Sequence, residues 1–81
     1  DFMVNMSDIK TIFSNIGRND IDENVDDLFE KKIMDSIAIM DLVGAIEDFY
    51  GIEIDFDYLE YDNFKNLFTI QNMIESILSN E

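Results

Sequence analysis

The chain has 81 residues, of which 47% are hydrophobic, and its 19 acidic residues against five basic ones give a net charge of −14 at pH 7. It contains no cysteine and no histidine, which excludes disulfides, thiolate or imidazole catalysis, and zinc sites built from those residues. A surface this acidic repels nucleic acids and anionic membranes and attracts basic protein surfaces.

The length predicts one domain over residues 1–81, close to the size at which a single core becomes marginal. Residues 1–5 are expected to be disordered, or to be left over from expression. No apolar run reaches the roughly 20 residues of a membrane span, and the N-terminus lacks the basic and apolar regions of a signal peptide. We therefore expect a soluble, cytoplasmic monomer that neither inserts into membranes nor binds nucleic acid.

The first predicted helix covers about residues 8–16, with Ser7 as its N-cap and Gly17 at its C-terminal end. Its apolar residues recur at helical spacing: Ile9, Ile12, Phe13 and Ile16. The acidic stretch 19–32 has no such period and is predicted to be a long ordered loop. The expected anchors of this loop are Val25, Leu28 and Phe29.

The acidic loop partly matches the calcium-binding loop of an EF-hand. The segment DIDENVDDLFEK has oxygen-bearing side chains at ligand positions 1, 3, 5 and 7, namely Asp20, Asp22, Asn24 and Asp26. However, Val25 stands where the sharp turn needs glycine, and Lys31 where a bidentate glutamate belongs. A second partial match beginning at Asp55 fails at Leu59 and Glu60. No specific metal site is predicted, and a degenerate calcium-binding helical module remains an alternative.

The second helix is predicted over residues 36–50, with Asp35 as its N-cap and Gly51 just beyond its end. One wide stripe should face the core: Ile39, Leu42, Val43, Ile46, Phe49 and Tyr50. The opposite face mixes apolar and acidic residues: Ser36, Ile37, Met40, Asp41, Gly44, Glu47 and Asp48. Apolar side chains ringed by acids are typical of a docking surface for a basic partner, although scattered exposed apolar residues are also normal.

Residues 51–68 are predicted to form a connector that holds one short helical turn within 57–64. Its Ile52 and Ile54 alternate as in a strand, but no partner strand is evident. The last helix covers about residues 69–79, with Thr69 as its cap. The predicted fold class is all-α: a small antiparallel bundle of three main helices plus a short fourth, with a long loop between the first two.

A catalytic role for Ser36 is not expected. A serine nucleophile needs a base within hydrogen-bonding reach, and without histidine only a pair with Lys31 or Lys32 remains. The acidic surroundings disfavour the neutral amine that such a base requires, and no Gly-x-Ser-x-Gly segment is present. The chain is therefore not predicted to be an enzyme.

The segment MDSIAIMDLVGAIEDFYGIEI, residues 34–54, resembles the attachment region of acyl and peptidyl carrier proteins, the phosphopantetheine-binding family. The signature of that family is Asp-Ser, an apolar residue, and a helix that ends in acids, an aromatic residue, glycine and an extended Ile-x-Ile. The residues in register are Asp35, Ser36, Ile37, Leu42, Ile46, Glu47, Asp48 and Gly51. Together with LFEKKIMDS and NFKNLFTIQNMIESI, the resemblance covers about residues 8–78.

The resemblance implies that Ser36 carries a 4′-phosphopantetheine arm, attached from coenzyme A by a phosphopantetheinyl transferase, and that the arm's thiol holds acyl or aminoacyl groups as thioesters. It implies that Asp35 helps to hold the transferase's metal ion. It also implies that the transferase, a loading ligase and a downstream synthase or transferase dock on one surface, made of Ile37, Met40, Asp41, Glu47 and Asp48. Because the chain has no cysteine and no histidine, the cofactor would supply the sulfur of the thioester, and the transferase would supply the base that activates the serine.

Two departures from the family pattern bear on the pathway. Ile33 and Met34 stand where fatty-acid and modular carriers usually have glycine, and the last connector is longer than in typical fatty-acid carriers. The segment LFEKKIMDS is closer to stand-alone carriers, including the D-alanyl carrier protein of teichoic acid modification. Fatty acid, polyketide, nonribosomal peptide and cell-wall D-alanylation pathways all remain open. A plain acidic interaction domain, in which Ser36 only caps a helix, is the other alternative.

Overall fold

The computed structural model describes residues 3–80, which form three α-helices and three single turns of 3₁₀ helix, without a strand. The α-helices are α1 (Met6–Asn15), α2 (Ser36–Tyr50) and α3 (Leu67–Ser79). The 3₁₀ turns are η1 (Glu30–Lys32), η2 (Phe56–Tyr58) and η3 (Tyr61–Asn63). The predicted all-α class is confirmed. Two 3₁₀ turns, η2 and η3, replace the expected short fourth helix, because the connector repeatedly makes i→i+3 rather than i→i+4 hydrogen bonds.

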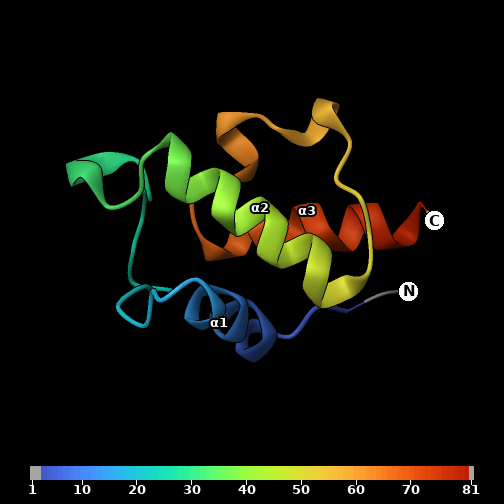
Figure 1. Ribbon diagram of the computed structural model, residues 1–81, viewed down its shortest axis with the longest axis horizontal. Helices are drawn as coiled ribbons and strands as arrows, with labels where there is room; N and C mark the ends of the chain where they lie inside the picture. The colour runs from blue at the N-terminus through green and yellow to red at the C-terminus, as the bar shows by residue number, and fades with distance from the viewer. Residues whose placement is uncertain (1–2, 81) are drawn as a thin grey trace.

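Helix α1 packs against both other helices and runs in the opposite direction to them, whereas α2 and α3 run in the same general direction (Figure 1). The expected antiparallel arrangement therefore holds for α1 alone. The reason is the connector between α2 and α3, which crosses back over the molecule before α3 begins (Figure 1). The fully buried side chains come from all three helices and from the loop, with Phe13 the largest: Phe13, Ile9, Ile12, Leu28, Leu42, Ile46, Leu67, Ile70 and Ile74.

The core stripe predicted for α2 is correct at its centre and wrong at one edge. Leu42, Val43 and Ile46 are buried, and Ile39 and Tyr50 are half-buried. Phe49, by contrast, is 40% exposed. Its ring packs edge-on against the ring of Tyr50, with the centroids 4.8 Å apart, and so lies beside the core rather than in it.

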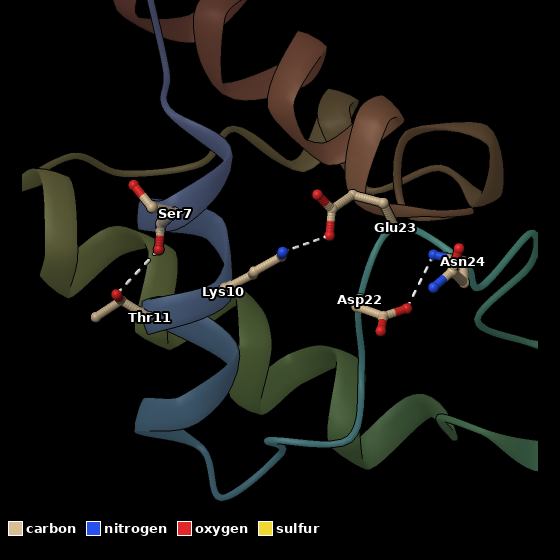
Figure 2. Close-up of polar contacts among 6 residues, drawn as sticks. All are labelled: Ser7, Lys10, Thr11, Asp22, Glu23 and Asn24. Atoms are coloured by element: carbon tan, nitrogen blue, oxygen red, sulfur yellow. Dashed lines mark hydrogen bonds and ion pairs between the residues drawn. The ribbon is translucent and has the colours of Figure 1, made fainter.

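Two predicted helix starts are also wrong. Helix α1 begins at Met6, so Ser7 lies inside it, and the Ser7 carbonyl accepts a hydrogen bond from the Thr11 hydroxyl (Figure 2). Helix α3 begins at Leu67 because Asn66 is the better cap. Its Oδ1 accepts from the Thr69 amide at 3.0 Å while the Thr69 hydroxyl accepts from the Asn66 amide at 3.1 Å, which forms a capping box.

The N-terminal segment is more ordered than the sequence suggested. Val4 is buried, its amide donates to Glu75 Oε2 at 2.9 Å, and its carbonyl accepts from Gln71 Nε2 at 2.6 Å. Val4 is therefore fastened to α3, and the expectation of disorder is wrong at this position. The same expectation for Asp1 and Phe2 lies outside the described residues.

The loop between α1 and α2 is ordered, as predicted. Leu28 is fully buried, and its amide donates to the Lys65 carbonyl at 2.6 Å, which joins the loop to the start of α3. At the other end of the loop, Lys10 of α1 forms an ion pair with Glu23 at 2.6 Å (Figure 2). The C-terminal end of α2 also follows the prediction, because Gly51 adopts the left-handed conformation (φ 64°) that favours glycine.

Candidate functional site

Ser36 is the first residue of α2, and it is exposed. Asp35 precedes it in an extended conformation, and Asp35 Oδ1 accepts a hydrogen bond of 2.8 Å from the Ala38 amide. The predicted capping role of Asp35 is therefore confirmed. The first N–H groups of an α-helix have no acceptor within the helix, so those of Ser36 and Ile37 face outward at this end of α2.

The residues just before Ser36 are fixed by a buried side chain, and before that side chain lies a turn with strained backbone angles. Met34 is buried, and its amide donates to the Leu28 carbonyl at 2.8 Å. Before it, Lys31 and Lys32 both have positive φ angles, 53° and 56°. This conformation costs a non-glycine residue about 1–2 kcal/mol, which the surrounding contacts must offset. Ser36 therefore lies two residues beyond a fixed point of the core.

The outer face of α2 is as mixed as the sequence predicted. Ile37 is 74% exposed and Met40 57% exposed, and Asp41 and Asp48 are exposed among them. Glu47 differs from the other acids of this face. It is half-buried, and its Oε2 accepts a hydrogen bond of 2.9 Å from the Ile54 amide, so it fastens the connector to α2.

A cavity of about 310 Å³ opens beside Ser36. Its lining is mostly apolar and comes from the loop, α2 and the connector: Phe29, Ser36, Ile39, Met40, Leu59, Glu60, Tyr61 and Phe64. The phenol of Tyr61 donates a hydrogen bond to Asp27 Oδ2, and its ring lies 5.0 Å from that of Phe29. The connector wall of the cavity is thus joined to the loop through a buried carboxylate.

The sequence did not identify Asp27 and Tyr61 as partners. They lie 34 residues apart, and neither helical spacing nor a local motif connects them. The one available signal was the position of Asp27, directly before the loop anchor Leu28, which brings its side chain close to the core.

The Asp27–Tyr61 hydrogen bond predicts a specific pH dependence of stability. It lowers the pKa of Asp27 and raises the pKa of Tyr61 from 10.0 to about 12. The contribution of this hydrogen bond to stability should therefore be complete at neutral pH and be lost as the pH rises from 10 to 12. It should also fall in acid, as Asp27 is protonated. Urea unfolding at pH 8 should find Tyr61→Phe less stable than the wild type, and the difference should shrink above pH 10.

A matched control for this titration is Tyr50, whose pKa is raised to about 12 by burial and which is present in both proteins. Its titration affects both stability curves equally and leaves their difference unchanged. A difference between wild type and Tyr61→Phe that stays constant from pH 8 to 12 would contradict the assignment.

The partial calcium motif does not assemble into a ligand cluster. Asp20 accepts two hydrogen bonds of 3.0 Å from Arg18. Asp22 Oδ1 accepts a hydrogen bond of 2.9 Å from the Asn24 amide (Figure 2). Arg18 thereby lowers the pKa of Asp20. Within residues 3–80, no group of three or more potential metal-ligating acids comes together.

The donor set at Ser36 fits a phosphodiester. Ser36 is exposed, and the outward N–H groups and the positive end of the α2 dipole favour an anion beside its hydroxyl. The acid nearest to Ser36 in the sequence is Asp35, and one of its carboxylate oxygens already accepts a hydrogen bond from the Ala38 amide. No helix within residues 3–80 combines the length and the apolar character needed to cross a bilayer.

The chain belongs to the phosphopantetheine attachment site family, whose model matches residues 7–77. Members of this family are non-catalytic carrier domains with a covalently attached 4′-phosphopantetheine group. Searches of the curated proteins and of the solved structures returned no match.

Proposed function

We propose that Ser36 is the attachment site of the 4′-phosphopantetheine arm, and that a phosphopantetheinyl transferase adds it from coenzyme A. The observation that supports this is the exposed Ser36 hydroxyl at the start of α2, within the part of the chain that the family model covers. In the reaction, the Ser36 Oγ–phosphorus bond forms as the phosphoanhydride bond of coenzyme A breaks. The hydroxyl proton passes to a base of the transferase, and adenosine bisphosphate leaves.

The bound arm supplies the thiol that the chain lacks, on which acyl or aminoacyl groups are held as thioesters. The chain's own residues present the arm and recognise its enzymes. Asp35 fixes the start of α2 and offers its charge to the metal ion of the transferase. Ile37, Met40, Asp41, Glu47 and Asp48 form the docking surface for the transferase, the loading ligase and the downstream synthase or transferase.

We further propose a discrete carrier dedicated to one pathway. The residues before Ser36 support this, since Ile33 and the buried Met34 stand where fatty-acid and modular carriers usually have glycine. Fatty acyl, polyketide, peptidyl and D-alanyl cargo remain the candidates.

The test is to incubate the purified chain with coenzyme A and a broad-specificity phosphopantetheinyl transferase and to measure intact mass. The wild type should gain one phosphopantetheinyl group, and Ser36→Ala none. Asp35→Asn should retain the helix, because asparagine also caps well, yet be modified at least about tenfold more slowly through the loss of charge. A folded wild-type chain without any mass gain would refute the assignment of Ser36.

A further inference from the structure

The connector between α2 and α3 supplies half of the residues that line the cavity beside Ser36. They are Leu59, Glu60, Tyr61 and Phe64. Phe29 of the loop and three residues of α2 complete the mostly apolar lining. Ser36 is one of those three, so a group attached to its hydroxyl starts at the edge of this cavity. The position of the connector therefore determines how much of the cavity such a group can enter.

Residues 55–60 of the connector, here called the strap, are held by hydrogen bonds just beyond their two ends. At one end the Ile54 amide donates to Glu47 Oε2 at 2.9 Å, and at the other the Tyr61 phenol donates to Asp27 Oδ2. Between these ends, in the part of the chain that the structure describes, the backbone hydrogen bonds of the strap have their partners inside the connector. The strap is thus a compact segment that is joined to the rest of the fold mainly at its ends.

The end at Tyr61 differs from the other because the acceptor is buried. Asp27 is only 8% exposed, and its second oxygen accepts a hydrogen bond of 2.9 Å from the Phe29 amide. Movement of the strap away from the loop would leave Asp27 Oδ2 without its donor, away from bulk water, which is unfavourable for a charged group. A single hydrogen bond therefore favours the closed position of the strap.

We propose that the Asp27–Tyr61 hydrogen bond is a latch that holds the strap closed against the cavity beside Ser36, and that its release lets the cavity take up an apolar acyl group carried on the arm. The latch consists of one donor and one acceptor, so loss of the phenol oxygen frees the strap while the ring stays in the lining. An apolar group is the expected occupant because the lining is mostly apolar. The inference rests on the proposed function for this occupant alone, since the latch can be tested on the unmodified chain.

The test titrates the unmodified chain with N-phenyl-1-naphthylamine, a neutral apolar dye that fluoresces in apolar surroundings. Tyr61→Phe removes the latch, so a larger fraction of the chain is open and the Kd of the dye should fall at least about fivefold. Asp27→Asn, which weakens the latch by removing its charge, should cause a smaller decrease. Tyr58→Phe is the matched control, because its hydroxyl contacts Asn80 at 3.5 Å and not the loop. Its Kd should stay within about twofold of wild type.

A second control separates opening of the strap from a general loss of stability. Ile12→Val removes one methyl group from a buried residue of α1, a helix that does not line the cavity. It should lower the melting temperature and leave the Kd of the dye within about twofold of wild type. An unchanged Kd for Tyr61→Phe, or an equal decrease for Ile12→Val, overturns the latch.

The occupant is tested by loading octanoyl-phosphopantetheine onto Tyr61→Phe from octanoyl-coenzyme A with a broad-specificity transferase. The bound octanoyl group should exclude the dye and raise its Kd at least about tenfold. Equal dye binding by the loaded and unloaded chains overturns the acyl group as the occupant and leaves the assignment of Ser36 intact. A chain that gains no mass overturns the assignment of Ser36, whereas the dye titrations of the unmodified chain still decide the latch.

Discussion

Replacing Phe13 by alanine should lower the free energy of unfolding by about 3–5 kcal/mol, because the ring, in the last turn of α1, is fully buried and its removal leaves a cavity. The whole free energy of unfolding of a chain of this length is only roughly 4–12 kcal/mol. The melting temperature should fall by more than about 10 °C, as measured by circular dichroism.

Phe56→Ala is the matched control, since the same substitution there removes a ring that is 82% exposed. Its stability should lie within about 0.5 kcal/mol of wild type. The pair also tests whether loading of Ser36 requires the folded bundle: the transferase should modify Phe56→Ala at the wild-type rate and Phe13→Ala only to the extent that it remains folded. Equal melting temperatures for the two variants would contradict the described core.

Reversing the charge of both Asp41 and Asp48 to lysine should slow loading of Ser36 by about 10–100-fold in kcat/KM at low salt, while the fold remains intact. Both carboxylates are exposed and belong to the proposed docking surface, so the substitution turns attraction of a basic partner into repulsion. The defect should narrow as sodium chloride is raised to about 1 M, where the screening length is near 3 Å. Loading rates and circular dichroism at several salt concentrations provide the measurement.

The control for charge alone is the double substitution of Glu53 and Asp57 to lysine, which changes the net charge equally at exposed positions of the connector. An equal defect in both double variants would mean that net charge, and not the α2 face, determines the rate. Glu47 is unsuitable for this test, because its reversal would also break the hydrogen bond to the Ile54 amide.

The features that could be predicted from the sequence are those that depend on local periodicity and on helix caps. Helix α2 begins and ends at the predicted residues because Asp35 and Gly51 are strong signals at its two ends. The predicted start of α3 is two residues too late. Thr69 and Asn66 are both good N-cap residues, and only the reciprocal hydrogen bonds between them show that Asn66 is the N-cap. The exposed position of Ser36 at the start of α2 followed from that same Asp35 cap.

Features that depend on distant pairs were not predictable in this way. The Asp27–Tyr61 hydrogen bond and the attachment of Val4 to α3 each join segments that have no common period. In the same way, Glu47 looked equivalent to Asp41 and Asp48 on a helical projection. Only the return of the connector past the end of α2 distinguishes it.

The engagement of Glu47 with the connector has a consequence for partner selectivity. An enzyme that draws Glu47 Oε2 away from the Ile54 amide leaves that amide without its acceptor, which costs about 1–3 kcal/mol if no new acceptor is found. That penalty subtracts from affinity at Glu47 but not at Asp41 or Asp48. By thermodynamic reciprocity, a partner that displaces the Ile54 amide from Glu47 also loosens the start of the connector.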